Sequence, residues 1–163
     1  MVIHDGISTP VLSHPQDPEE TVKYSIVFLP DPWSADTVYY TSESVVLPPQ
    51  FNGFYYQAMS GGISGSRAPT FPQKAGEKVS DGGVEWVAIP YNFFMSPGDR
   101  LNSVAWLSDT PEVVFSGEAI SGGVASVLVS GIPDSVPQVK ITARASIGQE
   151  SIDRSFIIPV RSL

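Results

Sequence analysis

The chain lacks cysteine altogether and is poor in charged residues, above all in basic ones. With no cysteine among its 163 residues, it can form neither a disulfide nor a thiolate site, which fits assembly in a reducing cytoplasm. Charged residues make up 16%, and nine Lys and Arg stand against 17 Asp and Glu, giving a net charge of −8 and a pI of about 4.5. Because an acidic surface repels phosphate backbones, we expect no nucleic acid as a partner.

Long apolar runs are missing as well. No apolar stretch approaches the roughly 20 residues needed to span a bilayer. Met1 is soon followed by His4 and Asp5, where a secretory signal peptide would carry a basic segment and then an apolar core. We therefore expect neither a membrane partner nor a signal peptide.

Proline and glycine, by contrast, are abundant and spread along the whole chain. There are 15 prolines and 14 glycines, and each proline removes a backbone donor and blocks a helix interior. The longer windows that remain, 112–132 and 138–158, are rich in β-branched residues, serine and glycine. At 42% hydrophobic residues the chain can still bury a core. This composition predicts an all-β fold with many turns.

Residues 1–20 are predicted to form an extended N-terminal arm. Pro10, Pro15 and Pro18 forbid a helix there, and an isolated strand is unstable. The arm nevertheless carries several apolar side chains, namely Val2, Ile3, Ile7, Val11 and Leu12. Two interpretations stay open: a frayed terminus, or an arm that docks on a neighbouring subunit through these five residues.

Residues 21–32 together with 91–163 are predicted to form a β-sandwich of immunoglobulin type. In the strand expected at 21–29, apolar residues alternate with polar ones until Pro30 stops it. The alternation is clearest at 139–145, which indicates one buried and one solvated face. Further short strands are expected at 101–107, 112–115, 124–129 and 152–160. The first of these contains Trp106, which we expect to be a core anchor.

Residues 33–90 are predicted to form a small aromatic β module inserted into that sandwich. Its expected strands are separated by a Gly/Ser loop and by a turn at residues 80–83, where Asp-Gly-Gly favours positive φ. The return strand carries Trp86, which we expect to lie in the module core because aromatic side chains bury a large area. The expected strands are 37–40, 44–47, 54–59 and 84–89.

Two resemblances support this division. A module that recurs in bacteriophage virion proteins has the same order of residues as Trp33, Ala35, Tyr39, Val46, Gly53, Tyr56, Ser64-Gly65, Pro69, Pro72, Val79, Asp81-Gly82 and Trp86. The stretch from Ser96 through Trp106 to the C-terminal strand resembles the immunoglobulin-like domains of phage fibre-to-tail adaptor proteins. In that family Asp-Pro and an apolar strand run directly into a Gly-Asp turn. Here residues 33–88 separate Asp17-Pro18 from Gly98-Asp99, which indicates an insertion.

The resemblance implies a non-enzymatic structural protein of a tailed bacteriophage virion, assembled in the cytoplasm of the bacterial host. It implies an adaptor between tail or neck and a fibre, with other virion subunits as partners and with several copies forming a homo-oligomer. A head decoration protein is the first alternative, because immunoglobulin-like sandwiches also serve there.

A carbohydrate-binding module that contacts the host surface is the second alternative. The order Trp33, Tyr39, Val46, Gly53, Tyr56 and Ala58 also resembles chitin-binding-type modules, which stack exposed aromatic rings on sugar faces. Tyr40 and Tyr55 alternate with Tyr39 and Tyr56 along their strands. If either ring points outward, it is the expected glycan contact.

No motif indicates catalysis, a metal or a cofactor. Ser64 lies in Gly-Ile-Ser-Gly-Ser, which lacks the second glycine and the following helix of a nucleophile elbow. The scattered acids, Asp81 among them, are typical of solvated turns rather than of a paired-carboxylate site. Since the two histidines are His4 and His14 and there is no cysteine, no zinc cluster is expected.

Overall fold

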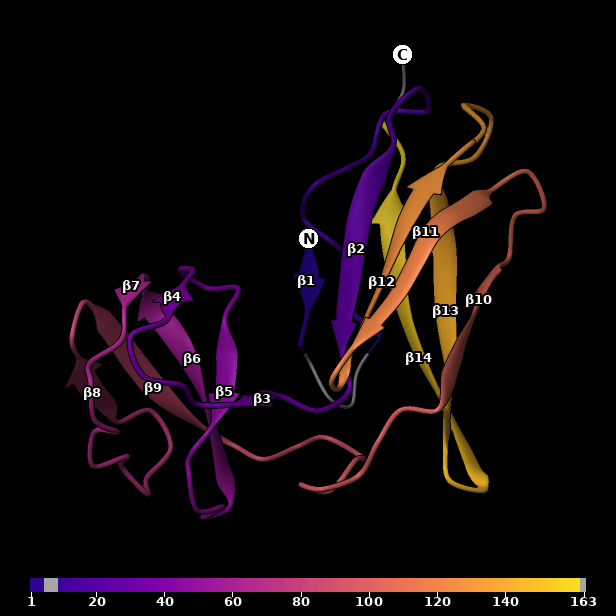
Figure 1. Cartoon of the computed structure of the whole chain (residues 1–163). Coiled ribbons are helices and arrows are strands. Elements are labelled where there is room, and N and C mark those ends of the chain that lie inside the picture. Colours follow the sequence, from indigo (N-terminus) through magenta and orange to yellow (C-terminus); the bar gives the residue numbers. More distant parts are fainter. Residues whose placement is uncertain (5–8, 162–163) are drawn as a thin grey trace. The chain divides into compact units, whose positions relative to one another are not determined.

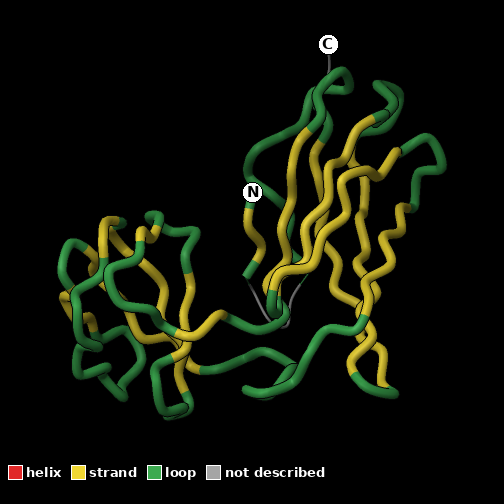
Figure 2. The backbone as a smooth tube through the Cα atoms, viewed as in Figure 1, coloured by secondary structure: helices red, strands yellow, loops and turns green. Residues whose placement is uncertain are grey.

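The computed structural model describes residues 1–4 and 9–161, and these form strands and loops without a helix. The all-β sandwich predicted from the sequence is confirmed (Figures 1 and 2). The chain divides into two compact units, one formed by Met1–Leu29 with Phe93–Leu163 and the other by Pro30–Asn92. Each unit has its own core.

The first unit is a sandwich of two sheets. One sheet has the order β1 (Val2–Ile3), β2 (Val22–Val27), β12 (Val124–Ser130) and β11 (Val114–Ser121). The other has the order β10 (Ser103–Ser108), β13 (Gln138–Ile147) and β14 (Glu150–Pro159). β2 pairs antiparallel with β12. The expected pairing of 21–29 with a strand of 101–160 is therefore confirmed, and the second unit is an excursion between β2 and β10.

Alternation along the strands builds the sandwich core. Each inward side chain of a core strand removes apolar surface from water, at about 25 cal/mol per Å². The rings of Tyr24 and Phe156 meet across the core with centroids 5.1 Å apart. The predicted buried face of β13 is fully inaccessible to solvent, at Val139, Ile141, Ala143 and Ala145.

The N-terminal arm packs on its own unit, whereas the two interpretations left open from the sequence were a frayed terminus and docking on a neighbouring subunit. β1 pairs in parallel with β2. Further along the arm, the Leu12 amide donates to the Ile157 carbonyl at 2.9 Å. The sheet edges supply backbone partners that an isolated, proline-interrupted segment lacks. The arm therefore covers the outer edges of both β2 and β14.

The five apolar residues of the arm have different environments. Ile3 is 5% exposed and belongs to the sandwich core, and Leu12 packs against that core. Val2 is half-buried, whereas Val11 is 62% exposed. Ile7 lies outside the described residues. Ile3 and Leu12 are thus unavailable as docking residues in this structure.

Gln16 ties the arm to the sandwich interior. Its Nε2 donates to the Val129 carbonyl at 3.0 Å and to the Glu20 carbonyl at 3.1 Å, and its Oε1 accepts from the Tyr24 hydroxyl at 2.8 Å. Burial, with a smaller contribution from the charge of Glu20, raises the pKa of Tyr24 to about 12. Both polar atoms of the buried Gln16 amide are therefore hydrogen-bonded, as is usual for buried polar groups.

The second unit contains a five-stranded sheet and a two-stranded ribbon. The sheet has the order β3 (Asp31–Pro32), β5 (Val45–Leu47), β6 (Phe54–Ser60), β9 (Val84–Pro90) and β8 (Lys78–Asp81). The ribbon pairs β4 (Val38–Tyr39) with β7 (Gly62–Ile63). Residues 30–32, which were expected in the sandwich, belong to this unit because Asp31 pairs with Val46.

The two tryptophans that were expected in the cores differ in how deeply they are buried. Trp86 is 0% exposed in the module core, which confirms its prediction. Trp106, predicted as a core anchor, packs against the sandwich core but is only partly buried, so it lies at the margin of that core. The reason is its position on β10, which is the edge strand of its sheet.

Candidate functional site

The polar centre of the module is the carboxylate of Asp81, at the end of β8. Its Oδ2 accepts from the indole Nε1 of Trp33 at 2.8 Å and from that of Trp86 at 2.9 Å. Its Oδ1 accepts from the Gly65 amide at 2.8 Å. The residue is 4% exposed. Because three distant segments donate to one buried carboxylate, Asp81 links the fold together and is not a solvated turn residue.

Gly82 and Ser64 pack next to Asp81 and fix the backbone around it. Gly82 has φ +57°, and a Cβ there would lie 2.7 Å from the Ile63 carbonyl oxygen, so only glycine fits this close backbone approach. The Ser64 hydroxyl donates to the Ser34 carbonyl at 2.7 Å and accepts from the Thr37 amide at 3.0 Å. Ser64 is 3% exposed. Its hydroxyl is therefore part of the packing and is not presented as a nucleophile.

The tyrosines of the phage-like pattern are structural too. The Tyr56 hydroxyl donates to the Pro72 carbonyl at 2.7 Å, and the Tyr56 ring lies 4.5 Å from that of Phe71. The Tyr39 ring meets Trp86 edge-on at 4.9 Å. Burial raises the pKa of both tyrosines. The residues that carry the resemblance thus form the core of the module, and a binding surface must lie elsewhere.

Tyr40 and Tyr55, the predicted glycan contacts, lie in opposite environments. Tyr55 is 3% exposed within β6, so its ring cannot stack on a sugar. Tyr40 is 64% exposed and follows β4. Val38 and Ile63 are cross-strand partners nearby and are also more than half exposed. Of the two tyrosines, Tyr40 alone presents a ring to solvent.

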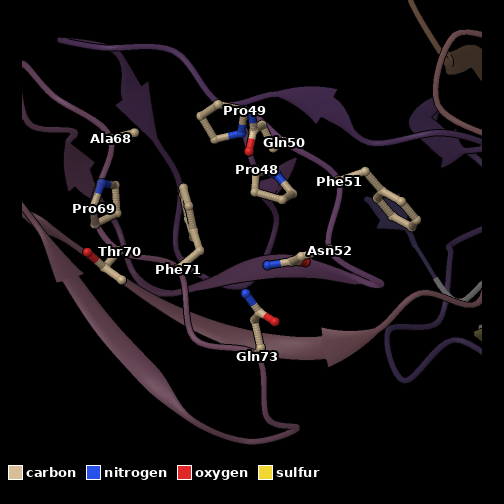
Figure 3. A pocket seen from close by; sticks show the side chains of 10 residues that line it. All are labelled: Pro48, Pro49, Gln50, Phe51, Asn52, Ala68, Pro69, Thr70, Phe71 and Gln73. Atoms are coloured by element: carbon tan, nitrogen blue, oxygen red, sulfur yellow. The ribbon is translucent and has the colours of Figure 1, made fainter.

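A groove of about 730 Å³ lies between two loops of the module, residues 48–52 and 68–73 (Figure 3). Phe51 is 47% exposed at its wall, and its ring is held edge-on against Tyr91 with centroids 4.9 Å apart. The lining residues are Pro48, Pro49, Gln50, Phe51, Asn52, Ala68, Pro69, Thr70, Phe71 and Gln73.

The groove is uncharged and has a mixed polar and apolar lining. None of its lining residues is charged. The side chains of Gln50, Thr70 and Gln73 form no hydrogen bond with another described residue, so their donors and acceptors are open to a ligand. Side-chain amides, a hydroxyl and an aromatic ring suit a neutral ligand rich in hydroxyl groups. This groove was not predicted from the sequence, although Pro-Pro-Gln-Phe-Asn at residues 48–52 carries an aromatic side chain in a loop.

Comparison with known proteins gives no match for this chain among protein-family models, curated proteins or solved structures. Across residues 1–4 and 9–161, no three His, Asp or Glu side chains gather where they could hold a metal ion. The same residues include no helix long and apolar enough to cross a membrane.

Proposed function

We propose that the chain is a non-enzymatic structural protein of a tailed bacteriophage virion, an oligomeric adaptor between tail or neck and a fibre. The observation that carries this proposal is the Asp81 centre. Trp33, Gly65 and Trp86, which are separate parts of the phage-like pattern, donate to this one carboxylate. Residues from separate parts of the pattern thus meet in one folding unit, which supports the proposal.

The architecture supports the same function. An inserted module in a loop of a sandwich gives one chain two compact units, which suits a subunit that contacts more than one neighbour. Within the module, Ser64 and Asp81 are the side chains that a nucleophile or a carboxylate mechanism would draw on. Both form hydrogen bonds inside the module and stabilise its fold. A head decoration protein remains the alternative role for the same architecture, and position in the particle separates the two.

We expect the chain in purified particles, at the tail or neck. The test is mass spectrometry of gradient-purified phage, followed by immunogold labelling with an antibody raised against the full chain. Gold at the tail or neck supports the adaptor, and gold over the capsid supports head decoration. A chain that stays in the soluble lysate and is missing from particles contradicts both.

Glycan binding is the second candidate, because the residues that line the groove include the half-exposed Phe51 and side chains that form no hydrogen bond with another described residue. Phe51 can lie against the apolar face of a neutral sugar while Gln50 and Gln73 bond its hydroxyls. The proposed contact then lies in the groove, apart from buried Tyr55 and from the exposed Tyr40, which stays an untested candidate.

For a glycan-binding groove we expect Phe51→Ala to weaken retention on host polysaccharide about tenfold, or about 1.4 kcal/mol. Tyr40→Ala is the matched control, since it removes another exposed ring, 64% exposed against 47% for Phe51. Affinity electrophoresis measures both, with the melting temperature as a check on folding. Wild-type chain that is not retained removes this candidate and leaves the structural role as it stands.

A further inference from the structure

β10 is an edge strand with one side open. It pairs with β13, and no other described strand is hydrogen-bonded to it, although β11 of the facing sheet lies near. Ser108 lies opposite Ile141, and the next residue, Asp109, donates from its amide to the Lys140 carbonyl at 3.2 Å. In an antiparallel pair, alternate residues face the neighbouring strand. The backbone groups of Val104, Trp106 and Ser108 therefore point away from β13, toward the open side.

The other edges of the sandwich are covered or protected. β1 has two residues, and backbone bonds from Leu12 and Gln16 run along β14. β11 carries Glu118, and its register shifts beside Gly117, which has φ +59°. A charge and a bulge are standard ways to prevent edge-to-edge pairing. β10 reads Ser-Val-Ala-Trp-Leu-Ser and has no charge, no proline, no glycine and no register shift.

We propose that β10 pairs antiparallel with β10 of a second copy of this chain, around a two-fold axis through Trp106. A two-fold axis perpendicular to the sheet keeps both hydrophobic cores on the same face. Trp106 then lies opposite the partner's Trp106, and Val104 lies opposite the partner's Ser108. All three outward-pointing residues are paired in this register, which gives about six backbone hydrogen bonds, two per pair.

Side-chain sizes fit this register. Ala105 and Leu107 lie on the outer face and would oppose each other across the interface, a small residue beside a large one. Leu107 is 40% exposed in the single chain and would cover the partner's Ala105. β10 carries no charge, so the net charge of −8 places no like charges directly against each other on the paired strands.

The inner face also has space. A cavity of about 330 Å³ lies between β10 and β11, lined in part by Val104, Trp106 and Ile120. The Trp106 ring reaches toward Phe115, with centroids 6.4 Å apart. Beside this partly exposed ring, the partner's Trp106 would pack into the open space, which Glu118 also lines. The strand is thus complementary to itself, which identifies the occupant as a second copy, whether or not the chain belongs to a virion.

We expect the full chain to sediment as a dimer at roughly 10 µM, and Leu107→Lys to sediment as a monomer with unchanged circular dichroism. Val114→Lys is the matched control, because Val114 is 53% exposed on the protected strand β11, and it should stay dimeric. If Leu107→Lys does not fold, Ala105→Lys replaces it, with the same expected monomer. A wild-type monomer at roughly 100 µM, or a folded Leu107→Lys or Ala105→Lys dimer, overturns the proposal.

The register has its own test, because the chain contains no cysteine. Trp106→Cys introduces one thiol, which would face its symmetry mate at about 5.5 Å between Cα atoms, within disulfide reach. We expect a disulfide-linked dimer on oxidation, seen on a non-reducing gel. Val114→Cys should stay monomeric on the same gel. Crosslinking of Val114→Cys without that of Trp106→Cys would overturn the β10 interface.

Discussion

Asp81→Ala is expected to unfold the module while the sandwich stays folded. The substitution removes the acceptor of three hydrogen bonds at 2.8–2.9 Å and leaves two indole N–H groups without it. Hydrogen bonds to a charged group contribute about 1.5–3 kcal/mol each, and a buried donor without a partner costs more. We expect a loss of roughly 4 kcal/mol, which is a large fraction of the stability of a domain of this size.

Urea unfolding followed by tryptophan fluorescence measures this change. Trp33 and Trp86 report on the module, and Trp106 reports on the sandwich. Asp81→Ala should move the module transition and leave the sandwich transition in place. Asp99→Ala is the matched control, since Asp99 accepts one bond from the Ser96 amide in an exposed turn. Equal effects of the two variants would contradict the central role given to Asp81.

Strong periodic patterns made the sandwich predictable. Alternation at 139–145 and at 21–29 is dictated by one buried and one solvated face, and both strands are present as β13 and β2. The insertion was implied by the resemblance alone, in which Asp-Pro and an apolar strand run directly into a Gly-Asp turn, whereas Asp17-Pro18 and Gly98-Asp99 are far apart in this chain. Trp86 was predictable since a small module has few places for so large a side chain.

Strands with mixed composition were missed or shortened. β11 was expected to end at residue 115 but extends to Ser121, because a bulge accommodates Gly117 within the pairing. β8 was not expected at all. Its residues, Lys78–Asp81, alternate little in hydrophobicity, and the strand exists because β9 provides its backbone partners. Both strands belong to hairpins, β11 with β12 and β8 with β9. The turns were visible in the sequence, but the composition of these strands did not show that they pair.

The candidate sites depend on exposure, which the sequence indicates poorly. Tyr40 and Tyr55 occupy similar patterns but are 64% and 3% exposed. Tyr55 lies on β6, in the middle of a five-stranded sheet, whereas Tyr40 follows the short edge strand β4. The groove depends on two loops, residues 48–52 and 68–73, that are far apart in sequence. Only the fold brings them together.

The last prediction with a large expected effect on stability concerns the N-terminal arm. Since β1 covers the edge of β2 and Ile3 is 5% exposed in the core, we expect deletion of residues 1–15 to destabilise the sandwich by roughly 4 kcal/mol or more. The deletion removes the buried Ile3 side chain. It also removes the Leu12 amide that bonds Ile157, and the Pro10 carbonyl that accepts from the Ile157 amide. Two bare sheet edges would then promote aggregation.

Single substitutions separate this role from docking on a neighbour. Ile3→Ala should lower the free energy of unfolding by about 2–4 kcal/mol, while Val11→Ala, at a side chain 62% exposed, should change it by less than about 0.5 kcal/mol. Urea denaturation followed by circular dichroism measures both against the deletion. If the deleted chain melts like the wild type, the arm adds nothing to its own sandwich, and the hypothesis that it packs on another subunit regains its basis.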